Sequence, residues 1–377
     1  MGVDLPETWV GHQTATACSL RRDTGAVVHR GETVGHIHLA GYEHRDTMAL
    51  DSSCRLYLGT ENGMQTAVLG DGQAAVVAEG LPGQAVRAIS PSPVTPGEAF
   101  VGCGVRGSGL YRTTDGGHTY TSLGFDDEWV WGLSRHPTDP ERLYVGTEPP
   151  GLWVSTDSGS SFERVDGIET LPSRENWFFF HPPFEAGHVH GISIHPDRPE
   201  QVFAGVEHGA IIYSRDGGVT WAESLAAEDI HRVAIHPDDP DRVFVAAGSG
   251  LYRSVDAGET WEQVPALAGE YAHAIEFDPR SPERLYVYVA TDGAPLYRSD
   301  DGGDSWVGVG DGLPDARAAD TLRLLPGDPD AVVYAGETDD GSRLFLSRDA
   351  GESWRRLALE LPMVWRLAVA DGGGSKR

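Results

Sequence analysis

The chain has 377 residues and a formal net charge of −28, and its single lysine is Lys376. An acidic excess of this size repels nucleic acid backbones and anionic lipid heads, which argues against both as partners. No apolar run approaches the roughly 18 residues that a membrane helix needs. The N-terminus has neither a basic start nor an apolar stretch, and the three cysteines lack metal-binding spacing. We therefore expect no signal peptide, free thiols and a cytoplasmic location.

The N-terminal part of the chain predicts short strands. Trp9-Val-Gly11 matches the second strand of later repeats, and Asp23-Thr-Gly25 stands where a degenerate turn phrase is expected. Another degenerate frame starts at His44 and continues at Arg55-Leu-Tyr57. These patterns predict that the two segments belong to two separate β-sheets.

One eight-residue phrase then recurs six times, as in Ser254-Val-Asp-Ala-Gly-Glu-Thr-Trp261. Its aspartates are Asp115, Asp157, Asp216, Asp256, Asp301 and Asp349. They lie 42, 59, 40, 45 and 48 residues apart. This period, with short strands between turn signals, is typical of radially repeated β-sheets.

Each repeat predicts four strands. Around Asp256 they cover 231–237, 242–248, 251–254 and 261–264. A last strand at 363–370 resembles the inner strands and completes the blade begun by residues 8–30, which leaves no sheet edge exposed. The prediction is one all-β domain over 1–377, a closed β-propeller of eight four-stranded blades, or seven if the N-terminal segment is an external flap. Residues 371–377 are predicted to form a flexible tail.

The phrase resembles the Asp-box (BNR) repeat of sialidases, sortilin-type receptors, some plant-polysaccharide hydrolases and photosystem assembly factors, all β-propellers. The resemblance covers about residues 86–360 and extends to the microbial sialidase-like, WD40/YVTN/BNR-like group. It implies a structural role for the six aspartates, whose carboxylates accept backbone N–H groups in the turn between the third and fourth strands. The acidic, lysine-poor composition resembles that of proteins from haloarchaea, where charge is an adaptation to a salty cytoplasm.

Aligned inner strands place one residue per blade around the axis of the propeller, on the face opposite the repeat turns. The aligned residues are His44, Ala85, Trp131, His190, His231, His273, Asp320 and Trp365. Histidine is the commonest transition-metal ligand, so His44, His190, His231 and His273 predict a metal centre at the channel mouth. Fe, Zn, Mn and Cu are not distinguished. The alternative to a metal centre is that these histidines only line a solvated channel, where they form hydrogen bonds.

Carboxylates are expected beside these histidines, because second strands end in Glu61, Glu148 and Glu207. Metal-bound imidazoles usually place their other ring nitrogen on such a partner. Carotenoid-cleaving oxygenases, which are also propellers, have the same arrangement of four histidines and three outer glutamates. The likeness concerns the site alone, because the sequences are not otherwise similar. His188 and His208 are secondary candidates on the same face. Glu148, Glu207 and Asp320 are the candidate catalytic carboxylates.

The longest spacing between phrases indicates an insertion at residues 166–187. Long loops on a rigid scaffold often carry recognition, so Trp177 and Phe180, together with Trp131 and Trp365, are predicted to form a ligand wall. Two alternatives explain the same aromatic cluster equally well: it fills an interface with another surface, or it forms a small core of its own.

Three functions remain open from the sequence. The first is a small-ligand-binding propeller with a metal centre, of oxygenase or lyase type if it is an enzyme. The second is a non-enzymatic scaffold that binds a protein partner on the same face. The third is a glycoside hydrolase of sialidase-like fold, although the Arg-Ile-Pro motif of true sialidases is absent from the sequence. Oligomeric state is not predicted.

Overall fold

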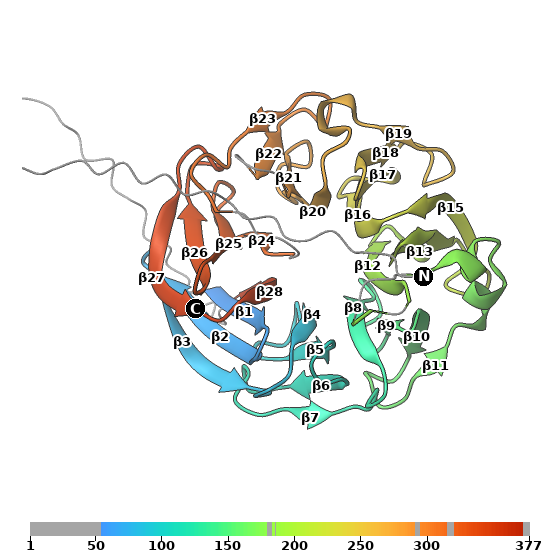
Figure 1. Ribbon diagram of the computed structural model, residues 1–377, viewed down its shortest axis with the longest axis horizontal. Coiled ribbons are helices and arrows are strands. Elements are labelled where there is room, and N and C mark those ends of the chain that lie inside the picture. Colours follow the sequence, from blue (N-terminus) through green and yellow to red (C-terminus); the bar gives the residue numbers. More distant parts are fainter. Residues whose placement is uncertain (1–53, 179–182, 185, 291–294, 315–319, 372–377) are drawn as a thin grey trace, which may run out of the picture. The chain divides into compact units, whose positions relative to one another are not determined.

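The computed structural model describes residues 54–178, 183–184, 186–290, 295–314 and 320–371. These residues form seven four-stranded sheets, which stand around a common centre like blades (Figure 1). The predicted all-β propeller of four-stranded blades is therefore confirmed, with the alternative count of seven. The preferred count of eight is wrong.

The strands run outward from the centre within each blade in the following order. Blade 1 contains β28 (Val364–Asp371), β1 (Cys54–Thr60), β2 (Gly63–Gly70) and β3 (Gln73–Gly80). Blade 2 contains β4 (Val86–Pro91), β5 (Ala99–Cys103), β6 (Leu110–Thr113) and β7 (Thr121–Ser122). Blade 3 contains β8 (Trp129–Arg135), β9 (Leu143–Glu148), β10 (Gly151–Ser155) and β11 (Glu163–Arg164). Blade 4 contains β12 (His188–His195), β13 (Arg198–Glu207), β14 (Gly209–Ser214) and β15 (Ala222–Glu228).

Blade 5 contains β16 (Ile230–His236), β17 (Asp239–Ala247), β18 (Gly250–Ser254) and β19 (Glu262–Gln263). Blade 6 contains β20 (Ala272–Phe277), β21 (Leu285–Val289), β22 (Leu296–Ser299) and β23 (Val307–Gly308). Blade 7 contains β24 (Leu322–Leu324), β25 (Val332–Thr338), β26 (Gly341–Ser347) and β27 (Arg355–Leu361). Three short 3-10 helices are η1 (Asp166–Thr170), η2 (Arg174–Asn176) and η3 (Pro265–Leu267).

Blade 1 explains the wrong count. The C-terminal strand β28 pairs antiparallel with β1, with Leu367 opposite Leu58, and so takes the innermost place of this blade. The prediction gave Arg55-Leu-Tyr57 an inner strand at His44 and gave the C-terminal strand a partner in residues 8–30, so this one blade was counted as two. His44 and residues 8–30, the predicted partner of the C-terminal strand, lie outside the described residues.

The second strand of each blade is the most deeply buried, because both of its faces pack against neighbouring blades. In β9 every residue from Leu143 to Glu148 is buried. Between blades 4 and 5, Phe203 and Ile211 pack against Val233 and Val245, all buried. The core is thus a set of apolar layers between sheets. Among the described residues, no helix is long and apolar enough to span a membrane.

The repeated aspartates fold the turns between third and fourth strands. In blade 4, Asp216 accepts the backbone N–H of Val219 at 3.1 Å and of Thr220 at 2.8 Å, and the Thr220 hydroxyl donates to its second oxygen at 2.6 Å. The same contacts to the residue four positions later are made by Asp115, Asp157, Asp256, Asp301 and Asp349. These donors, with the hydroxyl of Thr220 first, lower the pKa of Asp216 to about 2.

This lowered pKa predicts an acid limit of stability. An unfolded aspartate has a pKa of about 3.9, so the stabilisation by Asp216 is complete above that pH and is lost as the pH falls toward 2. We expect Asp216→Asn to lower the melting temperature at pH 6 and to flatten its decline between pH 5 and pH 2.5, measured by circular dichroism. Glu259→Gln, at an exposed site beside Arg215, is the control. A pH profile for Asp216→Asn parallel to that of the parent would contradict the prediction.

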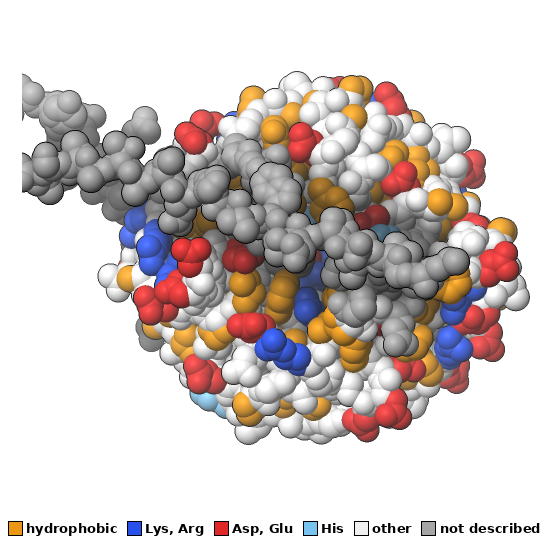
Figure 2. All heavy atoms as spheres, viewed as in Figure 1, with side chains coloured by type: hydrophobic (Ala, Val, Ile, Leu, Met, Phe, Trp, Pro, Cys, Tyr) orange, Lys and Arg blue, Asp and Glu red, His pale blue; other side chains and the backbone are white. Residues whose placement is uncertain are grey.

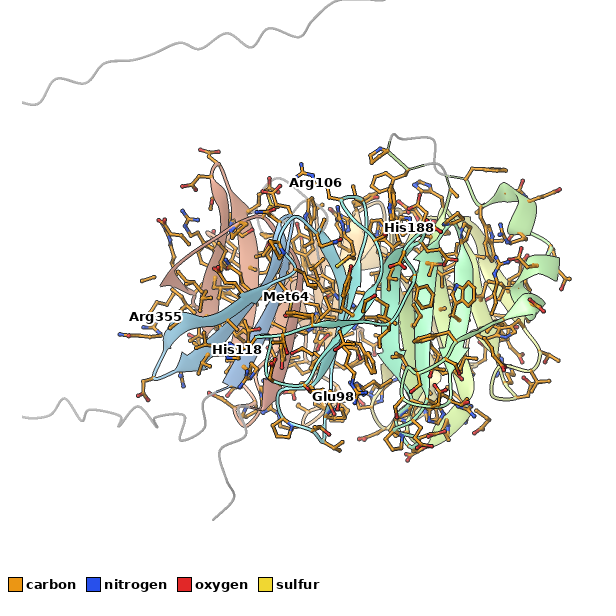
Figure 3. All side chains as sticks on the ribbon, turned by 90° about the horizontal axis from the view of Figure 1, so that it is seen from below. Met64, Glu98, Arg106, His118, His188 and Arg355 are labelled. Atoms are coloured by element: carbon orange, nitrogen blue, oxygen red, sulfur yellow. The ribbon has the colours of Figure 1, made fainter. Side chains whose placement is uncertain are left out.

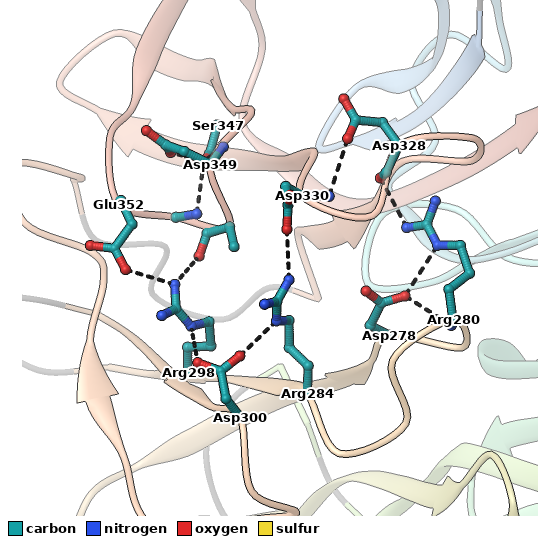
Figure 4. A network of polar contacts seen from close by, with 12 residues as sticks. Asp278, Arg280, Arg284, Arg298, Asp300, Asp328, Asp330, Ser347, Asp349 and Glu352 are labelled. Atoms are coloured by element: carbon teal, nitrogen blue, oxygen red, sulfur yellow. Dashed lines mark hydrogen bonds and ion pairs between the residues drawn. The ribbon is translucent and has the colours of Figure 1, made fainter.

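Arginines bind acidic residues across the edges of neighbouring blades. Arg284 of blade 6 donates to Asp300 in its own blade and to Asp330 beside blade 7, both at 2.7 Å. Arg298 contacts Asp300 at 2.9 Å and Glu352 at 3.0 Å (Figure 4). Each exposed pair contributes little alone, but a network of several fixes the two blades in register and offsets part of the acidic excess.

Candidate functional site

Bulges in the inner strands select the residues at the centre of the ring. The register of β16 skips one residue between Ile230 and Arg232, so His231 has no pairing partner on β17. A bulge of this kind turns a side chain out of the ladder. The extra residues of five inner strands are Arg87, Trp131, His231, His273 and Trp365. In β12 the irregularity follows His190.

These side chains contact one another in an arc around the axis. Arg87 lies over the rings of Trp365 and Trp131, and Trp131 stacks on His188 at 4.0 Å. The arc continues through ring pairs at 5.3 Å, 6.4 Å and 4.6 Å, which join His188, His190, His231 and His273 in that order. The predicted residues Trp131, His190, His231, His273 and Trp365 are therefore brought together. The position assigned to Ala85 belongs to Arg87, two residues later, which is the extra residue of the bulge in β4.

The arc lies toward one face of the ring. In the side view of Figure 3, His188 and Arg106 lie toward one face, and Glu98 and His118 lie toward the other. His118 follows Asp115 in a repeat turn. The histidines thus lie toward the face opposite the repeat turns.

His188 is the most enclosed member of the arc, at 1% exposure. Its Nε2 lies 2.6 Å from Glu207, and its Nδ1 lies 3.4 Å from Glu148. Burial alone would favour the neutral ring, but the attraction of Glu207 and Glu148 raises the pKa of His188 to about 9. His188 is therefore a cation at neutral pH, held between two carboxylates.

The neighbouring histidines have defined hydrogen bonds. His190 Nε2 donates to the Ile230 carbonyl at 2.5 Å. Burial, with the nearby His188 and His231, lowers the pKa of His190 to about 4, so the ring is neutral and Nδ1 carries the lone pair. His231 donates from Nδ1 to the Ala272 carbonyl at 2.6 Å.

A carboxylate and a tyrosine complete this side of the arc. The Asp229 carboxylate lies 3.3 Å from His231 Nε2 and accepts the Tyr271 hydroxyl at 2.7 Å. Burial disfavours a charge on His231, but the contact with Asp229 raises its pKa above the ordinary value. For His273, burial and the neighbouring His231 lower the pKa to about 3.

Two groups among the described residues bring three metal-ligating atoms within 4.8 Å of one another. The first is His188, His190 and Glu207, and the second is Glu207, His208 and Asp229. The predicted set shares only His190 with the first group. His231 and His273 are stacked with their planes 27° apart, and nearly parallel rings do not direct their in-plane lone pairs at one ion. The described histidines are therefore grouped differently from the predicted four-histidine centre.

The predicted carboxylates separate into different environments. Glu148 and Glu207 both contact His188, whereas Glu61 is 43% exposed and lies 3.8 Å from Arg106. Asp320 is buried and contacts Arg232 at 3.1 Å, Arg366 at 2.8 Å and Arg323.

The arginines around Asp320 decide its role. Burial opposes its charge, but their combined attraction holds the pKa of Asp320 far below the ordinary value. Asp320 is therefore a permanently ionised member of a salt-bridge cluster, which does not suit a general acid or base.

The aromatic residues of the insertion, residues 166–187, lie in different environments. Trp177 is 2% exposed and packs with Ile168, Leu171 and Val206 in the core between blades 3 and 4. It therefore belongs to a small core, not to a ligand wall. Phe180 lies outside the described residues. Phe184 contacts the rings of both Trp131 and His188, at 5.9 Å and 6.1 Å, and is the insertion residue that reaches the arc.

Comparison with known proteins gives partial matches. A family model described as Sortilin, neurotensin receptor 3 (Sortilin-Vps10) matches residues 249–370. A probable oligoxyloglucan-reducing end-specific xyloglucanase of Neosartorya fischeri is 25% identical over 49% of this chain, which spans 26% of that protein. Vacuolar protein sorting/targeting protein 10 of Colletotrichum graminicola is 34% identical over 23% of this chain and 6% of its own length.

Among solved structures, a GH74 xyloglucanase from Xanthomonas campestris matches with a TM-score of 0.61 and 16% identity, over 85% of this chain and 53% of the enzyme. The chain thus spans about a quarter of the curated xyloglucanase and about half of the solved one. At such identities the structural likeness shows the fold alone. The chain is a β-propeller related to those of GH74 xyloglucanases and of the Vps10/sortilin domain.

Proposed function

We propose that this propeller binds a divalent transition metal at the centre of one face and presents it to a small ligand. The observation that carries the proposal is the convergence of His188, His190 and Glu207, whose ligating atoms lie within 4.8 Å of one another. Two histidines and one carboxylate form a donor set that suits Fe²⁺, Mn²⁺ or Zn²⁺ and leaves coordination positions open. Such a metal would act as a Lewis acid or oxygen activator.

The surrounding contacts support this assignment. Glu148 contacts the Nδ1 of His188 and would orient that ring while Nε2 acts as ligand. The bond from His190 Nε2 to the Ile230 carbonyl fixes the orientation of that ring, and the same Nε2 lies 3.6 Å from Glu207. The proton that His188 holds between its carboxylates must leave on metal binding, so uptake should be accompanied by proton release.

The test is metal analysis of protein purified without chelator and then titrated with Zn²⁺ in a calorimeter. We expect about one ion per chain, lost in His188→Ala and Glu207→Ala, and a roughly 10- to 100-fold weaker affinity in Glu148→Gln. His118→Ala, a histidine toward the opposite face, is the matched control and should bind as the parent does. A parent that takes up no ion, or a His188→Ala variant that binds normally, would overturn the proposal.

Glycoside hydrolysis is a second candidate, favoured by the xyloglucanase relatives. It would use Glu148 and Glu207, which lie on either side of His188. However, His188 holds the pKa of Glu207 far below its ordinary value despite burial, so Glu207 would serve as a base or nucleophile and not as the proton donor. Release of reducing ends from xyloglucan oligosaccharides, abolished in both Glu148→Gln and Glu207→Gln, would favour this function. A protein that binds no metal but binds one defined protein partner would favour the non-enzymatic scaffold function.

A further inference from the structure

A second cluster at the centre of the ring consists entirely of hydrogen-bond donors. Arg87 is the extra residue of the bulge in β4, and its guanidinium carbon lies 4.1 Å from the ring centroid of Trp365 and 5.1 Å from that of Trp131. It thus contacts two tryptophans that come from β28 and β8. Figure 2 shows basic side chains at the centre of this face.

Arg87 has no acidic partner among the described residues within salt-bridge distance. This contrasts with Arg232, Arg323 and Arg366, which share Asp320. Burial lowers the pKa of Arg87 to about 10, so it still carries its charge at neutral pH. A partly buried cation without a salt-bridge partner is costly, and the charge of Glu207, beyond salt-bridge distance, offsets this cost only in part.

The two tryptophans add further donors without acceptors. The Nε1 atoms of Trp131 and Trp365 and the Nε of Arg87 are all buried and have no hydrogen-bond partner among the described residues. Several other indoles find acceptors, since Trp221, Trp306 and Trp354 donate to the carbonyls of Gly218, Gly303 and Val309, whereas the Nε1 of Trp153 in blade 3 is also buried without a partner among the described residues. At the centre of the ring, two such indoles lie beside a guanidinium whose Nε is also unsatisfied, so three donors without acceptors are grouped.

Guanidinium and indole N–H groups donate only, so the group that satisfies them must be an acceptor. Aromatic faces beside a guanidinium restrain it and leave its N–H edge for a planar or tetrahedral oxyanion. We propose that Arg87, Trp131 and Trp365 form a binding site for the carboxylate or phosphate group of a small ligand. The site adjoins the proposed metal centre through Trp131, which stacks on His188, but it rests on its own observations.

The test measures binding of inorganic phosphate and of malonate to the full chain by isothermal titration calorimetry, at constant ionic strength and in the presence of a chelator. The parent is expected to bind one of the two anions. Arg87→Gln should weaken that binding by about tenfold to a hundredfold, the usual effect of losing a charge-assisted hydrogen bond. Arg87→Lys, which keeps the charge, should retain more affinity than Arg87→Gln.

Further variants separate the donors from general charge effects. Trp131→Phe and Trp365→Phe keep the aromatic face, remove one N–H each, and should each weaken binding severalfold. Arg355→Gln, at the outer edge of the ring in Figure 3, should bind as the parent does.

Preference for phosphate or for malonate identifies the acid group. Binding of neither anion, or equal loss in Arg87→Gln and Arg355→Gln, overturns the site. Because the chelator removes metal, failure of the metal centre leaves the expected result unchanged.

Discussion

Asp320→Asn is expected to lower the free energy of unfolding by about 3–5 kcal/mol, the usual cost of removing one partner from a buried ion cluster. The carboxylate contacts Arg232, Arg323 and Arg366, and Glu276 is the only other acid near them, 3.8 Å from Arg323, among the described residues. Without Asp320, three arginines would face a single carboxylate in the middle of the ring. Urea unfolding followed by far-ultraviolet circular dichroism measures the loss, since urea, unlike guanidinium, does not screen charge.

Asp304→Asn is the matched control, because this aspartate contacts Arg253 at 2.6 Å while 71% exposed. Its loss should cost less than about 1 kcal/mol. Adding Arg366→Met to Asp320→Asn should restore part of the stability by removing one of the stranded charges. A fully stable Asp320→Asn variant would show that the cluster does not hold the blades together, and would return Asp320 to the candidates for chemistry.

The fold was largely predictable because its determinants are local. Each repeat phrase contains its own turn, in which an aspartate such as Asp256 accepts donors only four residues away. The number of blades depends instead on a pairing between β28 and β1, more than 300 residues apart. Strand patterns show that Val364–Asp371 is an inner strand, but not which segment it joins. The error was confined to that long-range pairing.

The centre of the ring was predictable in part, because the repeat places equivalent residues around one axis. Trp131, His231, His273 and Trp365 each occupy the bulge position of their strands. The alignment of β4 was displaced by two residues and reached Ala85 where the structure places Arg87, although β4 has its bulge at the same place as the correctly aligned strands.

His188 was underestimated for a related reason. It lies two positions before His190 on the same strand, and alternation alone places both side chains on one face. Its importance depends on Glu148 and Glu207 approaching from two different blades, which only the assembled ring shows. Asp229 and Tyr271 lie two positions before His231 and His273, as His188 does before His190, but the residue type differs from blade to blade, so the repeat gave no signal.

Trp177→Ala is expected to cost about 3–5 kcal/mol of stability, as is usual when a large buried aromatic side chain is truncated. Its ring fills the space between Ile168, Leu171 and Val206, and its Nε1 donates to the Ser173 hydroxyl oxygen at 2.8 Å. Ser173 in turn donates its own hydroxyl to Glu223 at 2.6 Å. Truncation would therefore leave a cavity and loosen the attachment of the insertion to blade 4.

Phe178→Ala is the control for this prediction, since the neighbouring aromatic is 51% exposed and its loss should change stability little. Measuring urea unfolding and Zn²⁺ binding on both variants separates the two roles of the insertion. If Trp177 belongs to the core, its truncation lowers stability while the folded fraction still binds metal as the parent does. If it forms part of a ligand wall instead, its truncation leaves the free energy of unfolding at the parent value. The first result is expected, because a side chain with 2% exposure has almost no surface left for a ligand.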